Sequence, residues 1–165
     1  MNNIVLIGMP GAGKSTVGVV LAKMAGMRFL DTDLSIQEYM GERLQDTIDR
    51  EGKQAFLRIE NIVVSGVRAE NTVIATGGSV VYGQSAVETL RENGVLVYLR
   101  YGLDTIASRL TDLDTRGVAM APGETIQDLY EERTPRYEAA ADVTVDCEGK
   151  SIEQIVVEIL SAVNR

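Results

Sequence analysis

The chain has 165 residues, a formal net charge of −8 and no histidine, which fits one globular domain over residues 1–165. Its negative charge argues against nucleic acid as a partner, because it repels a phosphate backbone. The single cysteine, Cys147, excludes an intrachain disulfide and a zinc cluster built from thiolates. Without histidine, any proton transfer must be carried out by a carboxylate or a lysine.

The chain also lacks the sequence features of a membrane or secreted protein. No stretch reaches the roughly 20 apolar residues that a membrane span needs. The N-terminal residues lack the charged region and the long apolar run of a signal peptide. We therefore expect a cytoplasmic monomer that acts on a small molecule and binds neither a membrane nor nucleic acid.

Short apolar runs alternate with segments of helical period along the chain. The runs are typical of strands buried on both faces, and we predict them at 3–7, 27–30, 72–75, 95–99 and 143–145. We predict helices at 14–25, 53–68, 85–92, 103–110, 125–140 and 151–162. The helix at 53–68 places Phe56, Ile59, Val63 and Val67 on one apolar stripe. Strands separated by helices indicate right-handed βαβ units, so we predict an α/β/α sandwich around a parallel sheet.

Residues 8–15 read Gly-Met-Pro-Gly-Ala-Gly-Lys-Ser, which fits the P-loop pattern Gly-x-x-x-x-Gly-Lys-Ser between an apolar strand and a helix. Glycines let backbone N–H groups converge on phosphate oxygens, and the positive end of the following helix adds to the attraction. We expect Lys14 to reach the β- and γ-phosphates of ATP and Ser15 to coordinate Mg²⁺. The predicted nucleotide contacts are Gly11, Ala12, Gly13, Lys14, Ser15 and Thr16. The alternative, a glycine-rich turn, needs no Gly-Lys-Ser ending.

Two absences narrow the choice among P-loop proteins. The chain has no Asn-Lys-x-Asp motif for reading guanine, and none of its predicted strands ends in an aspartate of the Walker B kind. These absences leave the small-molecule kinases. Residues 111–123, with two glycines, a proline and little periodicity, stand out as irregular, and we interpret them as a lid.

Further motifs follow the P-loop in a fixed order: Asp31-Thr-Asp33, Gly77-Gly78, Arg116, and Arg-Thr-Pro-Arg-Tyr at 133–137. Together they resemble the shikimate kinase family, within the nucleoside-monophosphate-kinase-like fold, over nearly the whole chain. The resemblance implies a five-stranded parallel sheet, a mobile lid, and a role in aromatic amino acid biosynthesis. The implied reaction is the ATP- and Mg²⁺-dependent phosphorylation of shikimate to shikimate 3-phosphate.

The two aspartates after the second predicted strand have two interpretations. By resemblance, Asp33 hydrogen-bonds the acceptor hydroxyl and takes its proton, while Asp31 lies near the water shell of Mg²⁺. A carboxylate near the γ-phosphate can orient a hydroxyl for in-line attack. Alternatively, an aspartate here caps a helix that starts near Ser35.

The glycine pair and the lid arginine also have alternatives. By resemblance, the backbone of Gly77 and Gly78 approaches the substrate ring, although Thr76 replaces the first glycine of the family's triplet; a tight turn would equally require glycines. Arg116 resembles the arginine that closes on the nucleotide phosphates and stabilises the charge of the transition state. A solvated loop arginine is the other interpretation.

The acceptor side departs from the family pattern. Arg133 matches the arginine that grips the substrate carboxylate, and Arg136 stands where the family has an apolar residue. In the family's Phe-Arg-x-x-Glu motif, Leu57 takes the place of an arginine that binds the same carboxylate. Arg58 is one residue late, and one helical step turns it by about 100°. Leu57 is thus predicted to line the acceptor pocket without a charge, which weakens shikimate binding or selects another acceptor.

Two alternatives to a shikimate kinase therefore stay open. One is a kinase for another small hydroxylated metabolite, such as an amino acid or a sugar acid. The other is a nucleotide-binding regulatory module without catalysis. Retention of Asp33 and Arg116 argues against such a module, because nucleotide binding alone needs neither residue.

Overall fold

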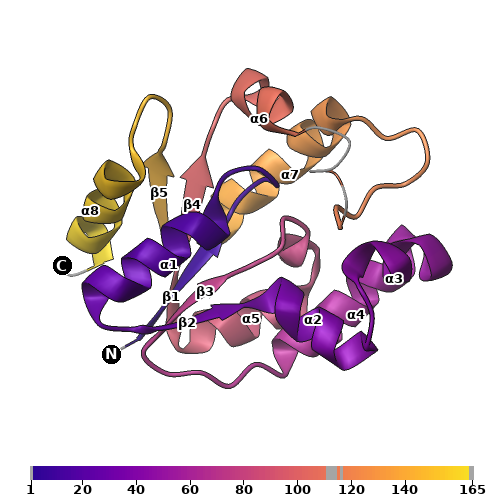
Figure 1. Ribbon diagram of the computed structural model, residues 1–165, viewed down its shortest axis with the longest axis horizontal. Helices are drawn as coiled ribbons and strands as arrows, with labels where there is room; N and C mark the ends of the chain where they lie inside the picture. Colours follow the sequence, from indigo (N-terminus) through magenta and orange to yellow (C-terminus); the bar gives the residue numbers. More distant parts are fainter. Residues whose placement is uncertain (1, 111–114, 116, 164–165) are drawn as a thin grey trace.

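The computed structural model describes residues 2–110, 115 and 117–163. Its centre is a five-stranded sheet in which every strand pair is parallel, with the order β2-β3-β1-β4-β5 (Figure 1). The strands are β1 Asn3–Ile7, β2 Arg28–Asp31, β3 Thr72–Ala75, β4 Gly94–Arg100 and β5 Val143–Asp146. The predicted α/β fold with a five-stranded parallel sheet is confirmed.

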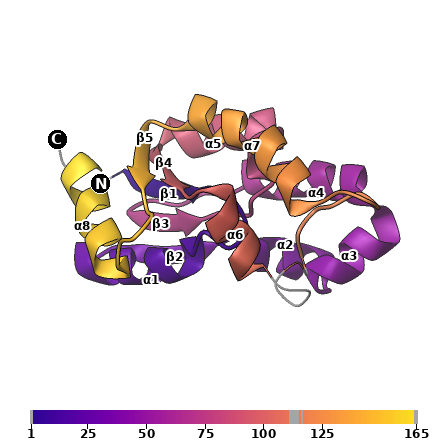
Figure 2. The same ribbon diagram turned by 90° about the horizontal axis from the view of Figure 1, so that it is seen from above.

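Helices cover both faces of the sheet. They are α1 Lys14–Ala25, α2 Thr32–Met40, α3 Leu44–Glu51, α4 Lys53–Ser65, α5 Gln84–Glu92, α6 Leu103–Arg109, α7 Ile126–Ala140 and α8 Ile152–Val163, with a 3₁₀ turn η1 at Val80–Tyr82. Helices α1 and α8 lie on one face, and α5 and α7 lie on the other (Figure 2). Helices α2, α3 and α4 gather beyond one end of the sheet. No helix of the described residues is long and apolar enough to cross a membrane.

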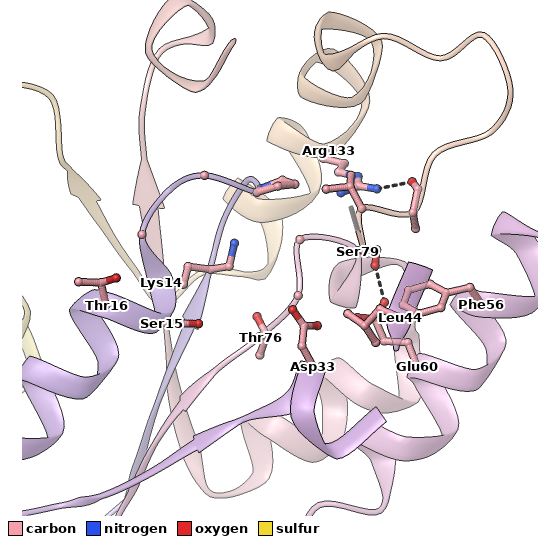
Figure 3. A pocket seen from close by; sticks show the side chains of 18 residues that line it. Lys14, Ser15, Thr16, Asp33, Leu44, Phe56, Glu60, Thr76, Ser79 and Arg133 are labelled. Carbon is pink, nitrogen blue, oxygen red and sulfur yellow. Dashed lines mark hydrogen bonds between the residues drawn. The ribbon is translucent and has the colours of Figure 1, made fainter. Parts of the chain in front are cut away.

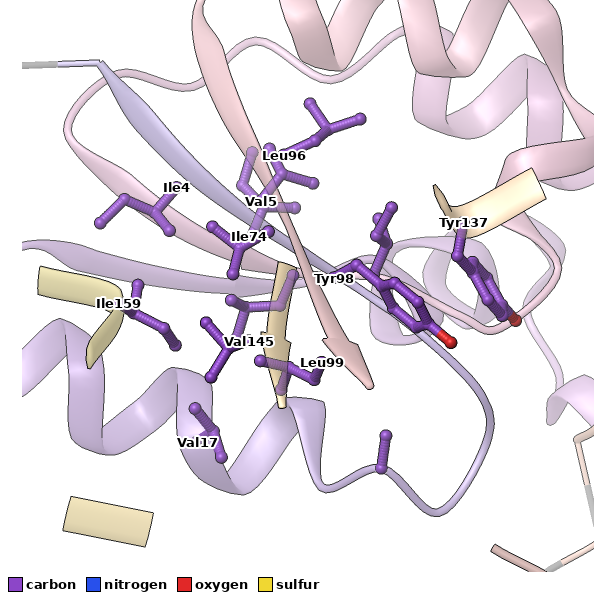
Figure 4. Close-up of a cluster of buried hydrophobic side chains, with 14 of the residues drawn as sticks. Ile4, Val5, Val17, Ile74, Leu96, Tyr98, Leu99, Tyr137, Val145 and Ile159 are labelled. Atoms are coloured by element: carbon purple, nitrogen blue, oxygen red, sulfur yellow. The ribbon is translucent and has the colours of Figure 1, made fainter. Parts of the chain in front are cut away.

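The main core packs around the central strand β1 and its neighbours (Figure 4). Val5 and Leu6 of β1 and Leu96 and Val97 of β4 are fully buried, as expected for strands covered on both faces. Burial of each such side chain contributes roughly 1.5–3 kcal/mol to folding. The two strands are thereby fixed, and with them the loops that leave their carboxyl ends.

A second apolar cluster joins the outlying helices. Its buried members are Ile36, Leu44, Ile48, Phe56 and Ala119, which come from α2, α3, α4 and the segment before α7. This cluster is small and separate from the sheet. It holds α2, α3, α4 and the segment before α7 together, and these face the P-loop across the pocket described below.

Helix α4 differs from its predicted pattern. Its most buried residues are Phe56, Glu60 and Val64, whereas Ile59 and Val63 are only partly buried against the second cluster. The predicted apolar stripe was therefore offset from the buried face, which carries a carboxylate. The helix also ends at Ser65, three residues before the predicted end, and the N–H of Gly66 caps it.

Candidate active site

A pocket of ≈ 310 Å³ opens where β1 and β3 end, between the P-loop and the outlying helices (Figure 3). Loops that leave the carboxyl ends of parallel strands converge there. The residues predicted to bind nucleotide or substrate that line it are Gly11, Gly13, Lys14, Ser15, Thr16, Asp33, Gly77, Gly78 and Arg133. The fold therefore brings together residues that are up to 122 positions apart, from Gly11 to Arg133.

The P-loop forms one end of this pocket. Gly13 is the N-cap of α1 with a φ of 78°, a conformation that favours glycine. Lys14 is 8% exposed, and its Nζ donates hydrogen bonds to the carbonyls of Gly8 at 2.7 Å and Met9 at 2.8 Å. Burial lowers the pKa of Lys14 to about 8, although the negative charge of Asp33 opposes the shift. Ala12, in contrast, is buried within the loop and does not line the pocket.

Asp31 links the P-loop to α2. Its Oδ2 accepts a hydrogen bond from Ser15 Oγ at 2.8 Å, and its Oδ1 accepts one from the Asp33 N–H at 2.9 Å. The second bond makes Asp31 the N-cap of α2, which begins at Thr32 instead of near Ser35. The capping interpretation is therefore correct for Asp31, and the same carboxylate also contacts the hydroxyl that the sequence assigned to the metal.

Two carboxylates converge on Gly77 in the floor of the pocket. A Cβ atom on Gly77 would lie 2.8 Å from Asp33 Oδ1 and 2.9 Å from Glu60 Oε2, so any side chain at this position would displace both carboxylates. Burial, and then the charge of Asp31, raise the pKa of Asp33 to about 6, against the opposing charge of Lys14. Burial also raises the pKa of Glu60 to about 7, although a hydrogen bond from Ser79 opposes the rise. Both groups can therefore exchange protons near neutral pH.

Arg133 of α7 forms the other charged end of the pocket. It is 1% exposed, and its Nη2 donates to the carbonyl of Ala119 at 2.9 Å. Its Nε has no hydrogen-bond partner among the described residues. One turn later on the same face, Tyr137 donates a hydrogen bond to the carbonyl of Gly78. A buried guanidinium with unused donors is suited to a carboxylate ligand.

Comparison with known proteins gives the family of this chain. The family profile described as shikimate kinase matches residues 10–164. The chain belongs to the shikimate kinase family. A shikimate kinase from Sulfurihydrogenibium sp. is 34% identical over 100% of this chain and 99% of its own length. The structure of shikimate kinase from Acinetobacter baumannii in complex with shikimate has a TM-score of 0.88 and 28% identity, covering 99% of this chain and 93% of that one. Shikimate kinase from Aquifex aeolicus has a TM-score of 0.81 and 31% identity, covering 98% and 96%.

Because the chain belongs to the shikimate kinase family, it is a small-molecule kinase. Its departure from the family motif at Leu57 is therefore important for the acceptor. Leu57 is half-buried against the second apolar cluster and is not among the residues that line the pocket; its neighbour Phe56 is. Arg58 is exposed, as the helical rotation predicted. Arg136 is exposed too, with its Cζ 4.7 Å from the centroid of the Tyr82 ring. Arg116, predicted to act on the nucleotide, lies outside the described residues.

Several residues of the shikimate kinase pocket were not singled out from the sequence. Glu60 is the fourth residue after Phe56, so both point from α4 into the pocket. Ser79 donates a hydrogen bond to Glu60 Oε1 at 2.6 Å, and Leu44 and Ala119 complete an apolar wall. The last position of the family's Phe-Arg-x-x-Glu motif is Glu60 and was a signal for it. No local signal marks Leu44 or Ala119, because only tertiary packing brings them to the pocket.

Proposed function

We propose that the protein transfers the γ-phosphoryl group of ATP to a hydroxyl of shikimate, giving shikimate 3-phosphate. The observation that carries the proposal is one pocket with Lys14 at one end, the buried Arg133 at the other, and Asp33 and Glu60 between them. Shikimate has a carboxylate, which an arginine can bind. It also has ring hydroxyls, which can donate hydrogen bonds to carboxylates. The relative from Acinetobacter baumannii, solved in complex with shikimate, supports this acceptor.

The nucleotide end fits ATP with Mg²⁺. Ser15 Oγ and Asp31 Oδ2 lie 2.8 Å apart, and a hydroxyl beside a carboxylate provides the oxygen ligands that Mg²⁺ prefers. The described residues contain no group of three acidic, cysteine or histidine side chains that could hold a metal. When bound, Mg²⁺ would neutralise part of the phosphate charge.

In the reaction, Asp33 is the residue that we assign to the acceptor hydroxyl. With a pKa of about 6, its carboxylate is largely ionised at neutral pH, so it can accept a hydrogen bond and then the proton of that hydroxyl. Lys14 provides a positive charge where negative charge develops on the transferred group. The lid at 111–123 and its Arg116 remain predictions of the family resemblance, because residues 111–114 and 116 lie outside the described part of the chain.

Within this proposal, Leu57 lowers the affinity for the acceptor. Because no arginine stands at position 57, Arg133 holds the acceptor carboxylate with fewer charged contacts. We therefore expect a high KM for shikimate. The same substitution is the observation that favours the second candidate, a kinase for another small hydroxylated acceptor.

An ADP-release assay distinguishes these activities. Purified protein would be supplied with ATP and Mg²⁺ and tested with shikimate and with a panel of hydroxyamino acids and sugar acids, and ³¹P NMR would identify the product. We expect ADP formation that depends on shikimate and yields a phosphate monoester. A faster reaction with another acceptor would replace shikimate, and slow ATP hydrolysis that no acceptor accelerates would refute the kinase proposal.

A further inference from the structure

The backbone at 117–124 lies against the acceptor end of the pocket. Gly117, Val118 and Ala119 line the pocket, and the side chain of Ala119 is buried in the second apolar cluster. The carbonyl of Ala119 accepts the hydrogen bond from Arg133 Nη2 at 2.9 Å. The position of this stretch therefore determines how the guanidinium is oriented.

Two side chains tie the ends of this stretch to the outlying helices. Gln45 of α3 accepts a hydrogen bond at its Oε1 from the N–H of Gly117 at 2.8 Å. At the other end, Lys53 Nζ of α4 lies 2.7 Å from Glu124 Oε1. Glu124 Oε1 also accepts a hydrogen bond from the N–H of Ala121 at 2.6 Å. Helices α3 and α4 thus hold the stretch from both sides.

The Lys53–Glu124 ion pair is shielded from solvent, unlike the other pairs. The two side chains are 10% and 19% exposed. In every other ion pair of the described residues, at least one side chain is 43% exposed or more. Exposed pairs contribute little, whereas removal of one partner from a shielded pair leaves a poorly solvated charge. This pair is therefore expected to hold the stretch more firmly than a surface pair would.

The pair and Arg133 are linked through Tyr82. Although burial opposes the shift, the hydrogen bond from Lys53 and the charge of Arg133 help to lower the pKa of Glu124. Lys53 Nζ is 5.9 Å and Arg133 Cζ is 5.5 Å from the centroid of the same ring, Tyr82. Lys53 stands one helical turn before Leu57 on α4. Neither Lys53 nor Glu124 lines the pocket, so neither is in a position to touch the reacting atoms.

We propose that Lys53 and Glu124 are positioning residues for the acceptor. Their ion pair holds the backbone at 117–124 so that the carbonyl of Ala119 orients Arg133 toward the acceptor carboxylate. The inference rests on the proposed function, because it assigns Arg133 to that carboxylate. Since the pair acts on binding and not on the transferred group, it sets the KM for the acceptor more than kcat.

A double-mutant cycle tests the pair, with Lys53→Met, Glu124→Gln and the double variant. In the ADP-release assay with shikimate we expect each single variant to raise the KM for shikimate about tenfold, the scale of one charge-assisted hydrogen bond. The KM for ATP should change less than about twofold. The double variant should resemble the single variants, because the second change removes a partner that is already unpaired. Lys150→Met is the matched control, since it removes a lysine from the exposed Lys150–Glu158 pair.

The outcomes separate this inference from the proposed function. If unmodified protein does not phosphorylate shikimate, the proposed function fails and this inference fails with it. If the unmodified protein does so but Lys53→Met leaves the KM for shikimate within about twofold, only the inference is overturned. Equal increases in the KM for ATP and for shikimate, or additive effects in the double variant, would overturn it as well. Hydrogen exchange at the amides of Gly117 and Ala121 should rise in the single variants and stay unchanged in Lys150→Met.

Discussion

Glu60→Gln should stabilise the protein in a manner that depends on pH. Glu60 is 2% exposed, and burial raises its pKa from 4.5 to about 7. The folded carboxyl group therefore binds its proton more tightly than the unfolded one. Below about pH 4.5 both states are protonated, and the full contribution of the group is present. As the pH rises toward 7, the unfolded state loses its proton first, so the contribution is lost.

The size of this effect follows from the pKa. A rise from 4.5 to about 7 corresponds to roughly 3 kcal/mol above pH 7, at about 1.4 kcal/mol per pH unit. Glutamine does not ionise, and its Oε1 can still accept the hydrogen bond that Ser79 donates to Glu60 at 2.6 Å. The variant should accordingly match the wild type near pH 4.5 and exceed it by about 3 kcal/mol at pH 8.

Urea unfolding followed by far-UV circular dichroism can measure the difference at both pH values, because the chain has no tryptophan for fluorescence. Glu38→Gln on the exposed side of α2 is the control, and its effect should be small and independent of pH. A stability gain for Glu60→Gln that is equal at pH 4.5 and pH 8 would refute the reasoning. It would mean that Glu60 does not ionise with a raised pKa in the folded state.

Three further substitutions test the assigned roles. Lys14→Ala should leave the far-UV spectrum unchanged and lower turnover roughly 10²-fold or more, the loss expected for a transition-state donor; near-normal activity would remove Lys14 from the mechanism. Asp33→Asn should lower kcat strongly with little change in ATP affinity, and wild-type kcat/KM should fall as the pH drops below about 6, because protonation removes the base. An equal loss of ATP affinity would move Asp33 to the metal site. Leu57→Arg should lower the KM for shikimate roughly tenfold and reduce stability, since Leu57 packs in the second apolar cluster; an unchanged KM would show that position 57 does not reach the acceptor.

The central fold could be predicted from the sequence because its signals are local. The runs at 3–7 and 72–75 coincide with β1 and β3, since strands buried on both faces are continuous apolar segments. Helices α2 and α3 were not delimited. On α2, Leu34 and Tyr39 are exposed while Ile36 is buried, so the apolar residues of this short helix do not mark one face.

In the candidate site, too, the part with a local sequence signal could be predicted and the part assembled by packing could not. The P-loop is a contiguous motif whose glycines and lysine each have a role that the sequence states directly. The acceptor end is assembled from several elements, and its members meet only through packing. Glu60 illustrates the difficulty. It lies on the buried face of α4, whereas the pattern of apolar residues predicted a buried stripe next to that face. The contact of Glu60 and Ala119 with one pocket becomes evident only in the structure.

The charge distribution explains why Arg133 matters more here than its single contact suggests. A chain with a formal charge of −8 repels an anionic acceptor and an anionic nucleotide alike. The attraction must then come from cations that water does not screen, and Lys14 and Arg133 are the two that are buried among the described residues. They sit at opposite ends of the pocket with two carboxylates between them. By the family resemblance, an arginine at position 57 would be a third cation for the acceptor. With leucine there, we expect acceptor affinity to depend on how the Ala119 carbonyl orients Arg133. The proposed role of the Lys53–Glu124 pair follows from this expectation, because the pair contributes to acceptor binding without touching the ligand.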